Sequence, residues 1–157
     1  MPKRKASHAE ISAFVHATED LSKVRSAITK ILSDQIAHKV EFTQTKMLGH
    51  HRNPIIELRV AITNKRDAYE ILQGIISRLS PLDETILDKE LAKHLDKKNR
   101  LYLRLDKQRA FIGEATLTSG DAISLRFSLR SRPRSLKELK TDLGINENNG
   151  DGTDANQ

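Results

Sequence analysis

The segment from Leu101 to Gly113, LYLRLDKQRAFIG, constrains the fold more than any other part of the chain. Its first half alternates apolar and polar residues, which is the period of a half-buried strand. The alternation then runs into Lys107, Gln108 and Arg109. A strand with one packed face and cations on the other predicts a flat, positively charged surface. Such a surface suits a sugar-phosphate backbone better than a small-molecule pocket does.

Similar patterns divide the rest of the chain. Alternation with period 2 predicts strands near 8–16, 38–46, 55–63, 99–106 and 121–130, with 110–117 as a hairpin-like return beside 99–106. Apolar stripes at helical spacing predict helices near 18–34, 65–79 and 80–95, and a short one at 135–144. Residues 47–54 contain Gly49 and Asn53-Pro54, which predict a loop.

Three helix starts carry capping signals. Thr18 is the expected N-cap of the first helix, with two acids in the following turn where they favour the helix dipole. Ser80 stands before Pro81, which is tolerated at the first helical position. Ser135 opens a capping box for the last helix.

The order of these elements predicts an α+β domain of two layers. Short connections between successive strands favour a mostly antiparallel or mixed sheet, with helices on one face and the other face open. We expect a basic N-terminal arm at 1–7, a single domain at 8–134, the short helix at 135–144 and a disordered acidic tail at 145–157.

Composition narrows the class of protein. The net charge is +6, and residues 141–157 carry four acids and no Lys or Arg, so residues 1–140 hold a net charge of +10. So basic a segment favours a polyanion such as nucleic acid as the binding partner, although many ordinary domains are equally basic. No apolar run approaches the roughly 20 residues of a membrane span, so we expect a cytoplasmic protein. Cysteine is absent, which excludes disulfides and thiolate chemistry.

Aromatic residues are scarce, with four Phe, two Tyr and no Trp. This scarcity argues against a surface that stacks single-stranded bases, and favours folded or double-stranded RNA.

The basic candidates for binding fall into three patches. The first patch is Arg100, Arg104, Lys107 and Arg109, the second is Arg126, Arg130, Arg132 and Arg134, and the third is His50, His51 and Arg52. If the two C-terminal strands pair, the first two patches share one face of the sheet. Arginine suits this task because its planar fork binds phosphate with two hydrogen bonds. The ordinary alternative is a solvated face, since charges point outward on any exposed strand.

Motifs for catalysis, phosphate loops and metal sites are missing from the sequence. The adjacent His50 and His51 lack the convergent ligands of a metal site. The segment from His16 to Asp20 reads first as a helix start rather than an acid-base site. We therefore predict no enzyme activity, no cofactor and no metal.

Three segments carry a resemblance to a known family: Val15-His-Ala-Thr-Glu-Asp20, Gly49-His-His-Arg-Asn-Pro-Ile55, and Leu101 to Gly113 followed by Asp121-Ala-Ile123. In order and spacing over roughly residues 7–130, the chain resembles the archaeal RNA-binding protein family predicted to be an exosome-associated subunit. That family has a fold similar to the large-subunit ribosomal protein that binds five-S ribosomal RNA. One departure is Arg52, where the family pattern has glycine.

The resemblance implies an α+β domain with a role in RNA biology, and Arg104, Lys107 and Gln108 match its motif. We predict a non-catalytic protein that recognises structured RNA through a basic sheet face, in RNA processing or ribosome-associated work. Two alternatives stay open. One is a protein-protein adaptor in an RNA-processing assembly, and the other, less favoured, is an RNA-modifying enzyme or nuclease.

Overall fold

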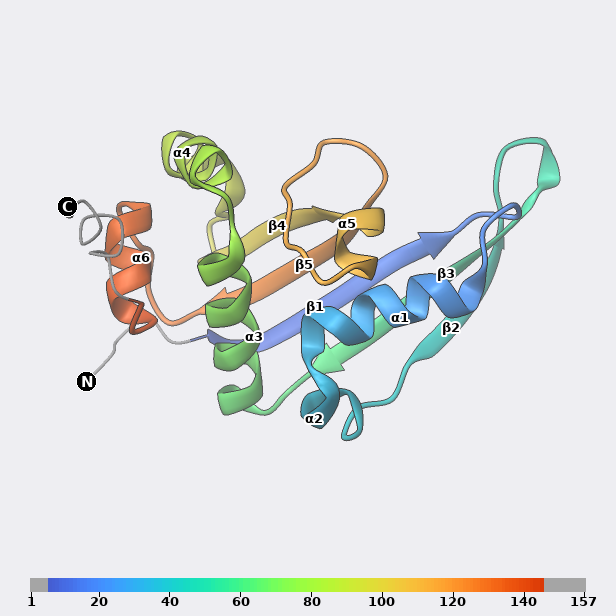
Figure 1. The fold of residues 1–157 in the computed structure, drawn as a ribbon, viewed down its shortest axis with the longest axis horizontal. Helices are drawn as coiled ribbons and strands as arrows, with labels where there is room; N and C mark the ends of the chain where they lie inside the picture. Colours follow the sequence, from blue (N-terminus) through green and yellow to red (C-terminus); the bar gives the residue numbers. More distant parts are fainter. Residues whose placement is uncertain (1–5, 146–157) are drawn as a thin grey trace, which may run out of the picture.

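The computed structural model describes residues 6–145, so most of the predicted arm and tail lie outside the described residues. Along the chain the elements are β1 (Ala6–Val15), α1 (Leu21–Leu32), α2 (Asp34–Ala37), β2 (Thr43–Leu48), β3 (Pro54–Ile62), α3 (Lys65–Arg78), α4 (Pro81–Lys89), β4 (Arg100–Asp106), α5 (Lys107–Phe111), β5 (Ala122–Leu129) and α6 (Leu136–Asp142), with 3-10 turns η1 (His50–Arg52) and η2 (Leu91–His94). Figure 1 shows their arrangement.

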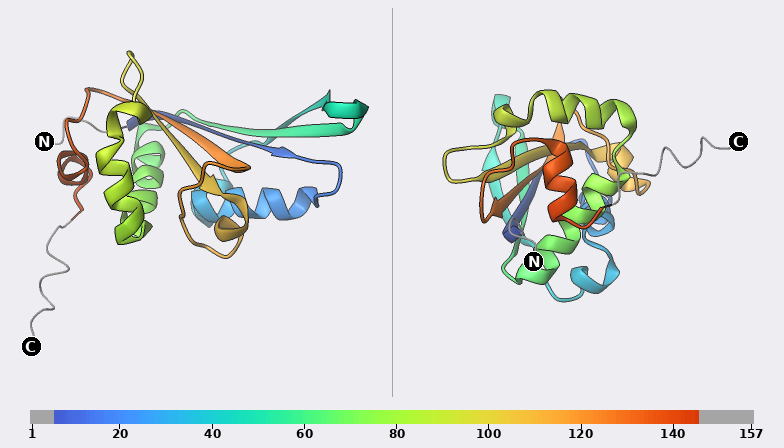
Figure 2. Two further views of the ribbon diagram at one scale, coloured as in Figure 1. Left: turned by 90° about the horizontal axis from the view of Figure 1, so that it is seen from above. Right: turned by 90° about the vertical axis from the view of Figure 1, so that its left-hand side faces the viewer.

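The strands form one five-stranded sheet in the order β2-β3-β1-β5-β4, and every neighbouring pair is antiparallel. Helices α1 and α3 lie against one face, and the opposite face is open, as the edge-on view in Figure 2 shows. The predicted two-layer α+β fold is confirmed. The β2–β3 hairpin projects from one end of the sheet, and the turn before β4 rises at the other end.

The core lies between the sheet and the helices. Alternate strand residues such as Ile11, Val60 and Leu125 point toward the helices and are fully buried, as are Ile28 of α1 and Ile75 of α3. Burying an aliphatic side chain of this size contributes about 1.5–3 kcal/mol. The period-2 patterns of these strands therefore determine which face of the sheet is covered.

The first helix begins later than predicted. Its N-cap is Asp20 rather than Thr18, because the Asp20 carboxylate accepts hydrogen bonds from both the backbone N–H and the hydroxyl of Ser22. These bonds lower the pKa of Asp20. The chain then turns at Ser33 into the short α2, so β2 begins at Thr43 and not near residue 38.

The predicted hairpin return at 110–117 is wrong. Residues Lys107–Phe111 form helix α5 instead, because Asp106 caps its N-terminus by accepting from the backbone N–H of Gln108, and Ala110 packs in the core. Only Leu117 makes an isolated bridge to β4, opposite Leu105. The outward side chains of β4 and α5 therefore do not continue along one surface.

The later helix starts agree with their signals. The hydroxyls of Ser80 and Ser135 accept from the backbone N–H of Asp83 and Glu138, each at 3.1 Å. Within the described part of the chain, the helices are too short or too polar to cross a membrane.

Candidate nucleic-acid interface

The open face of the sheet is the face opposite the helices. Three neighbouring strands, β1, β5 and β4, supply most of its outward side chains. These are His8, Glu10, Ser12 and Phe14 of β1, Ser124, Arg126 and Ser128 of β5, and Arg100, Tyr102 and Arg104 of β4. On β3 the outward residues include Glu57, Arg59 and Ala61. The strand register places Arg59, Ser12, Ser124 and Arg104 in one row across four strands.

Carboxylates hold two of the arginines on this face. Glu10 lies between Arg59 and Arg126, at 3.1 Å from one guanidinium and 2.5 Å from the other. Glu57 pairs with Arg59 at 2.7 Å. Burial alone would lower the pKa of Arg59, but the charges and hydrogen bonds of Glu10 and Glu57 raise it, so the guanidinium stays charged. The network neutralises part of the face and fixes where the guanidinium groups lie.

A third arginine is oriented by the turn before β4. The Asp96 carboxylate accepts from Arg100 Nε at 2.7 Å, from the Tyr102 hydroxyl at 3.0 Å, and from the backbone N–H groups of Lys98 and Arg100. Desolvation works toward a higher pKa, yet these hydrogen bonds hold the pKa of Asp96 far below its usual range. The carboxylate is therefore ionised at neutral pH and anchors both outward side chains.

Arg104 differs from the other arginines of the open face. Its guanidinium donates to the backbone oxygen of Gly120, and no carboxylate within residues 6–145 pairs with it. The side chain is exposed. Its charge is thus available to an anion.

Further cations lie at the end of the sheet where β4 begins and β5 ends. Lys97, Lys98, Arg130 and Arg132 are exposed there, and Arg132 donates to the backbone oxygen of Asp96 at 3.0 Å. Arg134 follows, with its backbone N–H bonded to Glu138. The structure therefore places Arg100, Arg104 and Arg126 on one face, with Arg130 and Arg132 at its end.

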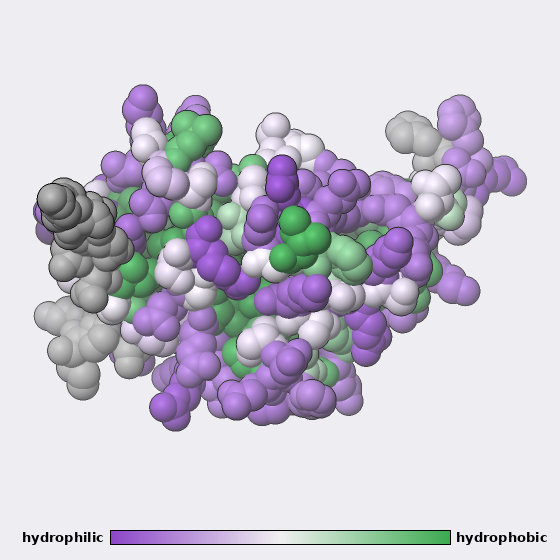
Figure 3. All heavy atoms as spheres, in the orientation of Figure 1, coloured by the Kyte–Doolittle hydropathy of each residue, from purple (hydrophilic) through white to green (hydrophobic). Residues whose placement is uncertain are grey.

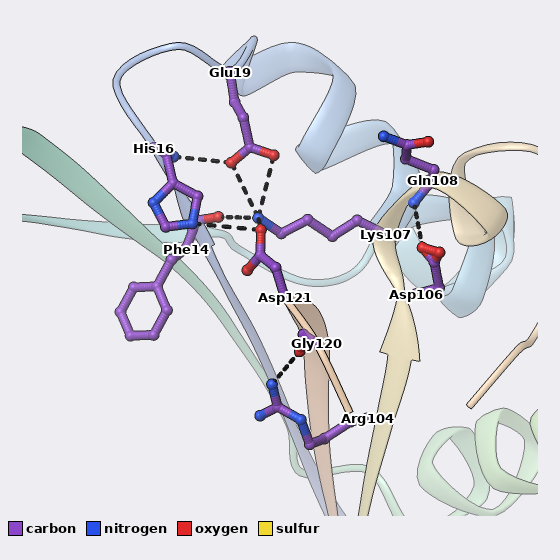
Figure 4. A network of polar contacts seen from close by, with 9 residues as sticks. All are labelled: Phe14, His16, Glu19, Arg104, Asp106, Lys107, Gln108, Gly120 and Asp121. Atoms are coloured by element: carbon purple, nitrogen blue, oxygen red, sulfur yellow. Dashed lines mark hydrogen bonds and ion pairs between the residues drawn. The ribbon is translucent and has the colours of Figure 1, made fainter. Parts of the chain in front are cut away.

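Lys107 does not join this surface. The strand pattern predicts an exposed cation, but the side chain is only 8% exposed. Its ammonium donates to the backbone oxygen of Phe14 at 2.5 Å, to Glu19 at 3.0 Å and to Asp121 at 2.8 Å (Figure 4). The reason is long-range: β1, the start of α1, α5 and the start of β5 converge on this point. The exposed role expected for Lys107 is wrong.

We call Lys107, Glu19, Asp121 and His16 the lysine cluster. His16 Nε2 lies 3.4 Å from Asp121, and the backbone N–H of His16 donates to Glu19 at 2.9 Å. Partial burial alone would raise the pKa of Asp121, but the hydrogen bond and charge of Lys107, helped by His16, lower it. Ligand atoms of His16, Glu19 and Asp121 lie within 4.8 Å of one another, close enough for a metal ion. The Lys107 ammonium already serves as the cation that these carboxylates hold.

The motif residues after Lys107 lie on the helix-covered side. Gln108 and Arg109 are exposed on α5, which packs against α1, and Arg109 pairs with Glu114 at 3.2 Å. This side is mostly hydrophilic, with a hydrophobic patch over α5 near the centre of Figure 3. Phe111 and Ile112 are the exposed apolar residues of that segment.

The third predicted patch lies at the tip of the β2–β3 hairpin, at the far end of the sheet from the β4 turn. His50, His51 and Arg52 form η1 there. Arg52 has φ of 62°, in the left-handed region that glycine adopts without strain. The tip therefore keeps the backbone conformation that glycine favours, although this chain has arginine at the position.

Sequence reasoning overlooked two exposed aromatic side chains on the open face. Phe14 is 43% exposed and Tyr102 is 39% exposed. The alternation that places Ala13 and Val15 inward also places Phe14 outward, so a signal was present. The small total number of aromatic residues was given more weight than this alternation.

Comparisons with known proteins found similar sequences and similar folds. The family described as RNA binding matches residues 8–129. RNA-binding protein PAB1135 of Pyrococcus abyssi is 32% identical over 133 residues, which cover 83% of this chain and 86% of that protein. Among solved structures, AF2318 from Archaeoglobus fulgidus superposes with a TM-score of 0.69 at 32% identity, covering 88% of this chain and 99% of that one. SSO0741 from Sulfolobus solfataricus has a TM-score of 0.68 at 25% identity, with coverage of 87% and 93%.

Proposed function

Because the chain belongs to the RNA-binding family that matches residues 8–129, we propose that it binds structured RNA across the open face of its sheet. The arrangement of arginines on that face is the observation that carries the proposal. Arg100, Arg104 and Arg126 project from two neighbouring strands whose register is continuous. The planar fork of arginine matches phosphate geometry.

The ion pairs on the face support binding rather than oppose it. Glu10 and Asp96 each contact one side of an arginine and restrict its rotation. A guanidinium has five N–H donors, so donors remain for a phosphate after one carboxylate is bound. Side chains ordered in advance lose less conformational entropy when RNA binds.

The length of the face favours an extended ligand. β1 has 10 residues, which span about 33 Å at ~3.3 Å per residue. Cations lie at both ends, with Arg130 and Arg132 at one and Arg52 at the other. A polyanion that follows the strands contacts both groups, whereas a small molecule reaches only one.

We propose that the protein acts without catalysis, as an RNA-binding component of an RNA-processing or ribosome-associated complex. The lysine cluster supports this view, because its titratable groups bond to one another and to the backbone. Arg104, Arg126 and the arginines at 130 and 132 are the expected phosphate contacts. Gln108 and Arg109 are expected to contact RNA only where it wraps beyond the open face, and Arg52 where it follows the strands to the hairpin tip.

The test removes two charges from the proposed surface. Arg104→Gln combined with Arg130→Gln should weaken binding to a fluorescein-labelled RNA stem-loop, measured by anisotropy between about 0.05 and 0.2 M salt. Each lost phosphate contact should reduce the slope of log affinity against log salt by roughly 0.7–0.9, so the double variant should lose roughly 1.4–1.8.

The matched control is Arg66→Gln with Lys65→Gln, which removes the same charge from the exposed start of α3 on the helix-covered side. That variant should keep the wild-type slope to within one phosphate contact. Equal loss of slope in the two double variants would mean that overall charge alone attracts the RNA, and would contradict binding on the open face. If the protein is an adaptor, neither double variant should change RNA binding, because the wild-type protein would itself bind little RNA at about 0.15 M salt.

A further inference from the structure

Three aromatic side chains of the described residues are exposed, and two of them lie on the open face. Phe14 and Tyr102 project from β1 and β4, while Phe111 lies on the helix-covered side with Lys30 at 5.1 Å from its ring centroid. A single exposed phenylalanine is ordinary on a protein surface. Two aromatic rings on the face that also presents the arginines are a feature with a specific chemical use.

The strand positions between the two rings carry polar side chains, and the serines among them are short. Tyr102 lies in one row with Arg126 and Glu10, and the next row toward Phe14 contains Ser12 and Ser124. Serine side chains are short, so the two rings project further from the sheet than Ser12 and Ser124 between them. From strand spacing and rise, the two aromatic positions are roughly 16 Å apart, which is too far for successive stacked bases at about 3.4 Å but suits nucleotides further apart along a strand.

Arginines lie on both sides of these two serines. The row of Ser12 and Ser124 ends in Arg59 on β3 and Arg104 on β4, directly beside the position of Phe14 along the strands. Cations on either side of exposed rings are the combination with which proteins bind unpaired nucleotides, since the bases stack on rings while the phosphates contact cations.

The Tyr102 side chain and the backbone of Phe14 are both held in place. The Tyr102 hydroxyl donates to Asp96 at 3.0 Å. The backbone of Phe14 is fixed by the lysine cluster, because the buried Lys107 ammonium donates to its carbonyl oxygen. In Figure 4 the Phe14 ring points away from that cluster while its carbonyl points into it. Lys107 thus positions the strand end that presents Phe14.

We infer that the open face holds two stacking sites for unpaired RNA bases, one on Phe14 and one on Tyr102, with the arginines beside them binding the phosphates. This inference rests on the proposed function and sharpens it. The scarcity of aromatic residues favoured fully paired RNA. Two rings on the binding face favour instead a structured RNA with a loop or bulge whose bases are unpaired.

The experiment compares three RNA probes on the full chain: a 12-nucleotide single strand carrying 2-aminopurine, a stem-loop, and the blunt duplex of the same stem. Stacking on a ring quenches 2-aminopurine fluorescence. We expect Phe14→Ala and Tyr102→Ala each to weaken binding of the single strand and the stem-loop about five- to 150-fold, the range of one lost stacking contact. The blunt duplex should bind each variant as it binds wild type.

Matched variants separate stacking from other effects. Phe14→Tyr and Tyr102→Phe keep the rings and should keep wild-type affinity and quenching, while Phe111→Ala removes an exposed ring from the other side and should change nothing. Thermal unfolding monitored by circular dichroism confirms that each variant is folded.

Two contrary results have different meanings. If folded Phe14→Ala and Tyr102→Ala bind every probe like wild type while Arg104→Gln weakens binding, the stacking sites are refuted and RNA binding on the open face stands. If the wild-type protein binds none of the probes, the proposed function fails, and the stacking sites fail with it.

Discussion

Replacing Lys107 by methionine should destabilise the protein substantially. Methionine keeps an unbranched side chain that reaches the ε position but removes the ammonium, so two carboxylates are left facing each other and the Phe14 carbonyl loses its donor. Removing one partner of a buried ion pair costs about 3–5 kcal/mol. Here the Glu19 and Asp121 side chains are 30% and 49% exposed, so water screens part of the repulsion. We therefore expect a loss of about 2–3 kcal/mol in the free energy of unfolding.

Urea unfolding followed by circular dichroism measures this loss. A chain of this size shifts its melting temperature by about 2–4 °C per kcal/mol, so the variant should melt roughly 4–12 °C lower than wild type. Lys23→Met is the matched control, because this lysine is exposed on α1 and its replacement should change stability by less than about 0.5 kcal/mol.

RNA binding supplies a second readout for the same variant. Since Lys107 is expected to act only through the position of Phe14, folded Lys107→Met should keep the wild-type salt slope and lose no more affinity than Phe14→Ala. Wild-type stability together with a slope reduced by roughly 0.7–0.9 would show that Lys107 contacts a phosphate directly, and would refute the reasoning.

Three further predictions concern the face, the hairpin and acid stability. Glu10→Gln should weaken RNA binding, because Arg59 and Arg126 lose the carboxylate that orients them, and should cost at most about 1 kcal/mol in urea unfolding; tighter binding at low salt would mean that Glu10 acts mainly by neutralising the two arginines. Arg52→Gly should stabilise the fold by about 0.5–1 kcal/mol by relieving the positive φ, whereas Arg52→Ala should not; equal effects of the two variants would argue against backbone strain. The pKa of Asp96 is lowered in the folded state, so its carboxylate stabilises the protein above about pH 4 and this contribution is lost as the pH falls further. Asp96→Asn should therefore be less stable than wild type at pH 7, with a difference that narrows below about pH 4; a difference independent of pH would exclude the charge as its cause.

Local sequence patterns were sufficient for the architecture. Alternation along β3 and β5 predicted both strands to within about one residue at each end, because a sheet with one covered face requires an apolar residue at every second position. The N-caps at Ser80 and Ser135 were predictable for a similar reason, since a cap depends on residues within one turn. The fold class followed from these elements and their order.

Patterns failed where two local signals competed. The sequence predicts a strand-like return after Asp106, yet residues Lys107–Phe111 form helix α5, since the cap at Asp106 and the burial of Ala110 favour the helix. Thr18 and Asp20 are both acceptable caps, and the hydrogen bonds to Ser22 decided between them.

What the sequence determined by itself is therefore the α+β architecture, the open face and the arginines that lie on it, because these depend on periodicity and on neighbours in the chain. Only the tertiary structure decided the role of Lys107, whose partners Phe14 and Glu19 are 93 and 88 residues away. It also decided that Phe14 and Tyr102, on strands separated by β5, share a surface with the arginines. Burial and pairing of a charge depend on which distant backbone and side-chain groups surround it, and no local pattern contains that information.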